Sequence, residues 1–122
     1  MHYYRDIIME IPLFELILTD EARLFLKSLA KEVRVKIGYN IRRVQKGERD
    51  VQIFKKLENS EIWEFRTIYN NTAYRLFAFW DTEINTLVVA THGIIKKTQK
   101  TPAKEITKAE KIRQLYFKNK NK

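Results

Sequence analysis

Two strand-like segments joined by a very short polar turn place the strongest constraint on the fold of this 122-residue chain. Residues 61–68 and 72–80 are rich in aromatic and β-branched side chains, which favour strands. Asn70 and Asn71 lie between them, and asparagine tolerates the positive φ angles that a tight hairpin turn needs. The pattern therefore predicts an antiparallel β-hairpin, which needs further strands or helices to be stable.

Apolar periodicity predicts the remaining elements. Residues 13–18 and 86–95 are apolar runs of strand length, and residues 21–30 and 31–46 repeat apolar side chains at helical spacing. A similar stripe over residues 103–116 predicts a last helix. The predicted order is β, α, α, β, β, β, α. We expect an α+β fold in which two N-terminal helices pack on one face of a largely antiparallel four-stranded sheet, followed by a C-terminal helix on the same face.

The ends of the two N-terminal helices carry recognisable signals. Thr19 and Asp20 can cap the first helix, and Gly47 is a suitable end for the second. Neither glycine nor proline marks the joint near Ala30, so the pair is either a helical hairpin or one kinked helix.

The charge balance points to a polyanionic partner. Lys and Arg number 24 against 15 Asp and Glu, which gives a net charge of +9. Residues 94–122 hold ten basic and two acidic side chains, a distribution that suits nucleic-acid phosphates or an acidic protein. We expect one domain over residues 1–122, with residues 119–122 as a frayed basic tail.

Several classes of protein are disfavoured by what the sequence lacks. There is no cysteine, which excludes disulfides, thiolate zinc sites and a cysteine nucleophile. The longest apolar run, residues 76–80, is far too short to cross a membrane. The apolar stretch over residues 7–18 is interrupted by charges and a proline, so we do not expect a signal peptide, and we expect a cytoplasmic protein without a membrane partner.

Two arginines lie within the predicted hairpin strands. Arg66 and Arg75 would be costly inside an apolar sheet unless each is paired or opens to water. They could clamp a phosphate while Phe77 and Phe79, on the face of Arg75, stack on bases. The alternative is a structural role.

In that structural alternative, carboxylates of the chain neutralise the two guanidinium groups. Arg66 would pair with Glu64 or Glu61, and Arg75 would pair with Asp81.

A second group of polar side chains follows the last predicted strand. His92 could exchange protons near neutral pH, and Lys96, Lys97 and Lys100 could stabilise charge on a phosphate. By spacing alone, a histidine at such a position is more often a hydrogen-bonded residue at the end of a strand. The only other histidine, His2, is remote in sequence, so we predict no metal site and no cofactor.

Four pieces of the sequence together resemble HigB-like toxins of the RelE/ParE superfamily, in particular the phage-derived branch. The pieces are residues 55–58 (KKLE), 62–66 (IWEFR), 73–77 (AYRLF) and 92–102 (HGIIKKTQKTP). The resemblance covers residues 13–116 and implies a RelE-like fold. It also implies a bacterial type II toxin, a metal-free endoribonuclease (mRNA interferase) that cuts mRNA on the ribosome and leaves a 2′,3′-cyclic phosphate. A cognate HigA-like antitoxin with a helix-turn-helix domain would neutralise it.

The resemblance also implies roles for individual residues. Arg75 matches the arginine of a tyrosine-arginine strand motif and would hold the scissile phosphate, and Arg66 matches a basic position on the preceding strand. We assign catalysis to Arg75, Arg66, Lys97 and His92. We assign RNA binding to Lys55, Lys56, Phe77, Phe79, Lys96, Lys100 and Lys104.

One departure from RelE leaves the general base open. RelE has lysines on the strand before the hairpin, where this chain has Glu64. The base is therefore His92, a lysine with a lowered pKa, or Glu64 itself. Two alternative functions also stay open: a ParE-like inhibitor of DNA gyrase, and an RNA-binding module without catalysis.

Overall fold

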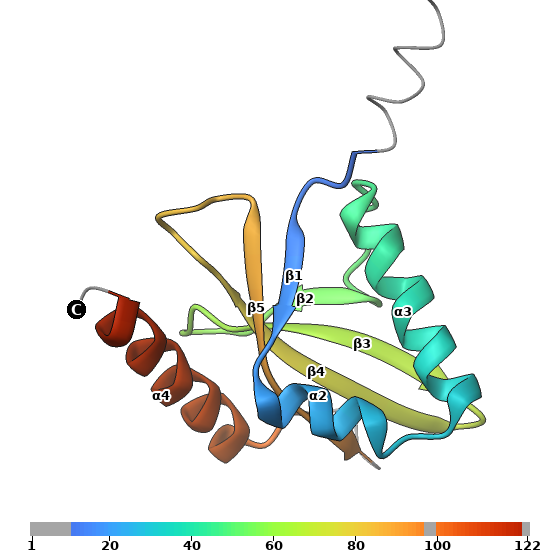
Figure 1. The fold of residues 1–122 in the computed structure, drawn as a ribbon. Helices are drawn as coiled ribbons and strands as arrows, with labels where there is room; N and C mark the ends of the chain where they lie inside the picture. Colours follow the sequence, from blue (N-terminus) through green and yellow to red (C-terminus); the bar gives the residue numbers. More distant parts are fainter. Residues whose placement is uncertain (1–10, 97–99, 121–122) are drawn as a thin grey trace, which may run out of the picture.

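The computed structural model describes residues 11–96 and 100–120 as strands and helices around one sheet (Figure 1). The elements follow the chain in the order β1 (Glu15–Leu18), α2 (Asp20–Lys27), α3 (Lys31–Gln45), β2 (Phe54–Lys56), β3 (Trp63–Tyr69), β4 (Thr72–Trp80), β5 (Leu87–Lys96) and α4 (Ala103–Lys120). In the part of the chain that is described, no helix is long and apolar enough to cross a membrane.

The sheet has five strands in the order β1-β5-β4-β3-β2, not the four that we expected. β1 pairs in parallel with β5, and all other neighbours are antiparallel. The strand that we missed is β2, which has only three residues and pairs with β3. The prediction of a largely antiparallel sheet is otherwise confirmed.

The predicted hairpin is present. Asn70 and Asn71 adopt φ angles of 49° and 64° and connect β3 to β4 in the left-handed conformation that asparagine tolerates. The register places Arg66 directly opposite Arg75. Because cross-strand partners point to the same face, the two guanidinium groups lie side by side on the sheet.

The two N-terminal helices are separate. The Thr19 hydroxyl caps α2 by accepting a hydrogen bond from the backbone N–H of Ala22 at 3.1 Å, and it donates to the carbonyl of Thr91 on β5 at 2.7 Å. Gly93 allows α2 to lie very close to β5, since a Cβ there would lie 2.2 Å from the ring of Phe25. Gly47, with φ of 101°, follows the end of α3 as predicted.

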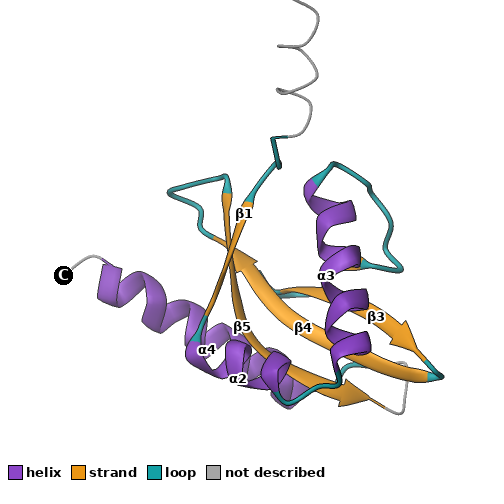
Figure 2. Ribbon diagram, turned by 45° about the vertical axis from the view of Figure 1, so that its right-hand side comes forward, coloured by secondary structure: helices purple, strands orange, loops and turns teal. Residues whose placement is uncertain are grey.

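Helices cover both faces of the sheet, so the expectation that all of them lie on one face is wrong. Buried residues of α2 and α3, together with Phe14 just before β1, form one core with one face of the sheet, and Figure 2 shows α3 across β3 and β4. α4 lies on the opposite side from α3 (Figure 1) and forms a second core. This second core includes Phe77, Phe79 and Val89 from the sheet and Ala109 and Ile106 from α4.

Hydrogen bonds to one buried carboxylate hold the C-terminal end of α4 against the sheet. The buried carboxylate of Asp81, at the end of β4, accepts hydrogen bonds from the Tyr116 hydroxyl at 2.7 Å and from the Lys120 ammonium group. The helix continues to Lys120, and the frayed tail that we expect over residues 119–122 stays a prediction. Residues 121–122 lie outside the described residues.

Candidate functional site

The face of the sheet that carries α4 is covered only in part. Toward the β3–β4 turn, Ile68 on this face is 59% exposed. Four cationic side chains share this region, one from each of four adjacent strands: Lys55, Arg66, Arg75 and Lys96. We call these four residues the basic cluster. A buried carboxylate, that of Glu64, lies among them.

Glu64 forms ion pairs with both arginines. Its Oε1 atom lies 3.4 Å from Arg66 Nε and 3.5 Å from Arg75 Nε. Two guanidinium groups on opposing strand positions repel each other, so a carboxylate between them is required. Arg66 therefore has one of the structural partners that we expected. The prediction that Arg75 pairs with Asp81 is wrong, because the Asp81 carboxylate accepts hydrogen bonds from α4 instead.

The arginines differ in their access to solvent. The Arg75 side chain is 1% exposed, and its Nη1 donates to the carbonyl of Tyr74 at 3.3 Å. The Arg66 side chain is 15% exposed, and its Nη1 donates to the carbonyl of Val51 at 3.0 Å. Neither Nε–H makes a hydrogen bond, although both are buried. Burial lowers the pKa of Arg75, and the carboxylate of Glu64 opposes this shift. Arginine nonetheless remains charged.

Lys96 and Thr101 extend this network. Lys96 Nζ lies 3.2 Å from Thr101 Oγ1, and the Thr101 hydroxyl donates to Oε2 of Glu64 at 2.8 Å. Lys96 is only 5% exposed. Burial lowers its pKa below the usual 10.5, and the charge of Arg75 lowers it further. Lys96 is thus a lysine with a lowered pKa, one of the three kinds of general base that the sequence allowed.

Lys55 and Lys56 point to opposite faces because they are neighbours on one strand. Lys55 is paired with Glu64 in the sheet register, so it belongs to the basic cluster and is exposed to solvent. Lys56 pairs with Trp63 on the other face, and its ammonium group donates to the carbonyl of Ser60 at 2.7 Å. The structure therefore separates two lysines that we had placed in one RNA-binding set.

His92 does not open onto the basic cluster. It is 1% exposed, and its Nε2 lies 3.1 Å from Glu105 of α4 while Nδ1 lies 3.0 Å from the Thr91 hydroxyl. Its ring packs against Phe77 with centroids 4.8 Å apart. Burial lowers the pKa of His92, which favours the neutral ring. The alternative of a hydrogen-bonded strand residue describes this geometry, because both ring nitrogens already have partners.

Phe77 and Phe79 are not available for stacking on bases. Both are fully buried beneath α4, and Phe79 packs against Tyr116 and Phe117. The sequence correctly placed them on the face of Arg75 but did not reveal that a helix covers them.

The remaining predicted lysines flank the start of α4. Lys100 and Lys104 are exposed, and Lys104 lies in the first turn of the helix. Lys97 lies outside the described residues. No group of three histidine or acidic side chains within residues 11–96 and 100–120 could hold a metal ion.

Comparison with known proteins places the chain in a family. The model of the family described as phage derived protein Gp49-like (DUF891) matches residues 24–114, which is most of the chain. The chain belongs to this Gp49-like family. The comparison with curated proteins finds no match.

A solved structure identifies the fold of this Gp49-like protein. A structure of the E. coli toxin RelE, in the free state and with two arginines replaced by alanine, aligns with a TM-score of 0.56 and 18% identity. It covers 82% of this chain and 96% of the RelE chain. A chain of the toxin-antitoxin complex RelBE2 from Mycobacterium tuberculosis aligns with a TM-score of 0.46 and 20% identity, covering 72% and 95%. The likeness to RelE shows that the protein has a RelE-like fold.

Proposed function

We propose that this Gp49-like protein is a toxin of RelE type that cleaves RNA at the basic cluster. The observation that carries the proposal is the arrangement of four cationic side chains around one buried carboxylate, with Lys55 exposed and Arg66 partly exposed at its edge. An excess of fixed positive charge at a rigid site favours phosphate binding and stabilises charge that develops on a phosphate. The RelE-like fold supports the same function.

Access to solvent suggests distinct roles within the cluster. Lys55 and Arg66 are the most exposed members, and they would make the first contacts with an RNA phosphate. Arg75 is buried, so it would act through its charge and by fixing Glu64. Glu64 uses one oxygen for the arginines and the other for Thr101, which suits a positioning role better than proton transfer.

Lys96 is the general base in this proposal. In its neutral form it would accept the proton of a ribose 2′-hydroxyl, whose oxygen attacks the adjacent phosphorus atom. The bond from phosphorus to the 5′-oxygen breaks, and the leaving oxygen takes up a proton from solvent water. The products are a 2′,3′-cyclic phosphate and a 5′-hydroxyl. No metal takes part in this scheme. Lys97, which the sequence placed among the catalytic residues, remains a sequence-based proposal.

The proposal includes two partners. The substrate would be mRNA on the ribosome, and a cognate HigA-like antitoxin with a helix-turn-helix domain would mask the toxin. We expect the antitoxin gene in the adjacent reading frame. A basic protein with net charge +9 is a suitable target for an acidic antitoxin segment.

Induction of the protein alone in a bacterial host tests the proposal. We expect growth to stop and defined breaks to appear in mRNA, and we expect Arg66→Ala to prevent both. Arg34→Ala, which removes an exposed arginine from α3, is the matched control and should remain toxic. Growth arrest with intact mRNA and inhibited gyrase supercoiling would instead establish the ParE-like function. RNA binding without breaks would establish a non-catalytic module.

A further inference from the structure

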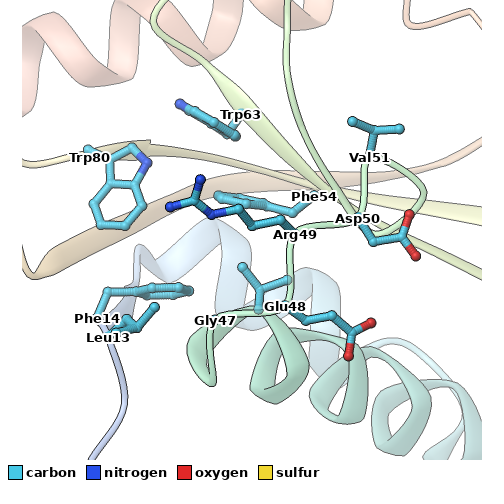
Figure 3. A pocket seen from close by; sticks show the side chains of 11 residues that line it. Leu13, Phe14, Gly47, Glu48, Arg49, Asp50, Val51, Phe54, Trp63 and Trp80 are labelled. Atoms are coloured by element: carbon cyan, nitrogen blue, oxygen red, sulfur yellow. The ribbon is translucent and has the colours of Figure 1, made fainter.

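A cavity of about 450 Å³ lies on the other face of the sheet, beside the C-terminal end of α3 (Figure 3). Four aromatic rings form its walls: Phe14, Phe54, Trp63 and Trp80. Phe54 and Trp63 stack with centroids 4.6 Å apart, and Phe14 meets Trp80 edge to face at 5.3 Å. We call this cavity the aromatic pocket. The rings of its walls pack against one another, and the pocket is large enough for a bulky side chain.

One charged side chain enters the aromatic pocket. Figure 3 shows the guanidinium group of Arg49 between Trp63 and Trp80. No ion pair or hydrogen bond with another described residue engages Arg49. The carboxylates of Glu48 and Asp50 also belong to the lining residues, but they point away from the rings (Figure 3). The interior of the pocket is therefore apolar with one available positive charge.

Both neighbouring carboxylates have partners outside the pocket. Glu48 forms an ion pair with Arg43 of α3. Asp50 accepts a hydrogen bond from the backbone N–H of Gln52 at 2.8 Å, which holds it in a turn. Neither carboxylate is placed to neutralise Arg49, so an anion from outside could do so.

The rim of the aromatic pocket is unusually apolar for a surface. Leu13 is 60% exposed and Val51 is 62% exposed, on either side of the rings. Exposed apolar side chains around a concave site are typical of surfaces that bind proteins. They disfavour a nucleic-acid backbone, which needs a polar and positively charged rim.

We propose that the aromatic pocket is a docking site for an acidic segment of a partner protein. The segment places a bulky apolar side chain between the rings, and an adjacent carboxylate of the segment pairs with Arg49. The choice of an acidic partner rests on charge complementarity with Arg49, the one charged side chain of the lining that points toward the rings. Tryptophan and arginine side chains are also among the residues that contribute most to protein interfaces. The inference is independent of RNA cleavage, which we assign to the opposite face of the sheet.

The two tryptophans provide a direct assay. Trp63 and Trp80 are the only tryptophans of the chain, and both line the pocket, so intrinsic fluorescence reports occupancy. The probe is the acidic peptide acetyl-Glu-Leu-Phe-Glu-Asp-amide, and the matched peptide is acetyl-Gln-Leu-Phe-Gln-Asn-amide. We expect saturable changes in emission with both peptides, and an affinity about tenfold higher for the acidic peptide, because a charge-assisted hydrogen bond has about this effect.

Variants assign the effect to the aromatic pocket. Arg49→Gln should remove the preference for the acidic peptide, whereas Arg34→Gln, an exposed arginine on α3, should leave it unchanged. Val51→Glu should weaken binding of the acidic peptide by charge repulsion at the rim. Val35→Glu is its control, because Val35 is 59% exposed and does not line the pocket.

Other occupants would give different results. If adenosine monophosphate changes the emission through Arg49 and the peptides do not, the pocket binds a nucleotide and the proposal is wrong. If the peptides bind only after deletion of residues 1–10, the occupant is the chain itself and the proposal is also wrong. Absence of any response to the acidic peptide would overturn it as well.

Discussion

Replacement of Glu64 by glutamine tests the electrostatic organisation of the basic cluster. The substitution preserves shape but removes the negative charge between Arg66 and Arg75, which lie 3.4 and 3.5 Å from one carboxylate oxygen. Loss of one partner from a buried ion pair costs about 3–5 kcal/mol. Arg66 is partly exposed and can recover some hydration, so the cost comes mainly from Arg75, which is 1% exposed. We expect a loss of about 3 kcal/mol in the free energy of unfolding.

Urea denaturation at neutral pH measures this change. A loss of this size corresponds to a decrease in Tm of roughly 10 °C for a chain of this length. Glu61→Gln is the control, because Glu61 is an exposed carboxylate near the start of β3, and its effect should stay within about 0.5 kcal/mol. Combining Glu64→Gln with Arg75→Gln should recover about 2 kcal/mol relative to the sum of the single effects. A loss below about 1 kcal/mol, or strictly additive effects, would refute the reasoning.

Three further predictions concern other parts of the molecule. Gly93→Ala should destabilise the fold by about 1–3 kcal/mol, because the added methyl group meets the ring of Phe25. Gly38→Ala, inside α3, should be neutral or should stabilise the fold by up to about 1 kcal/mol. Thermal denaturation compares the two variants. Burial raises the pKa of Asp81, but hydrogen bonds from α4 and the following turn outweigh it and lower the pKa to about 2. Stability should therefore be lost as pH falls from the ordinary value of 3.8 toward 2, and Asp81→Asn should flatten that part of the profile. Lys55→Ala should weaken RNA binding equally for different sequences and reduce the slope of log affinity against log salt by about one, in filter-binding measurements.

The elements that the sequence predicted well are those with strong local signals. The β3–β4 hairpin followed from two alternating strands and two asparagines, and the end of α3 followed from Gly47. β2 was missed because three residues are too few to show a period. The apolar stripe of α4 predicted a helix, but a stripe does not indicate which face of a sheet the helix covers. α4 packs on the face that carries Phe77 and Phe79 and therefore buries them.

The site was predictable in its residue types and less so in its contacts. The hairpin register alone places Arg66 opposite Arg75, so a carboxylate on a neighbouring position of the same face, Glu64, could have been identified as the shared partner. The contact from Thr101 to Glu64 could not, because it joins residues far apart in sequence. The aromatic pocket likewise depends on the packing of four separate segments, and no motif in the sequence indicates it.

Cleavage of a defined message by the purified protein on translating ribosomes tests the central claim most directly. We predict fragments that end in a 2′,3′-cyclic phosphate, and no cleavage when the nucleotide at the cut carries a 2′-deoxyribose. Lys96→Met should slow cleavage by about a hundredfold or more, as loss of a general base does. Lys111→Met, at an exposed position on α4, should not slow it. A message that stays intact while translation stops, or equal cleavage of the 2′-deoxy message, would contradict the account.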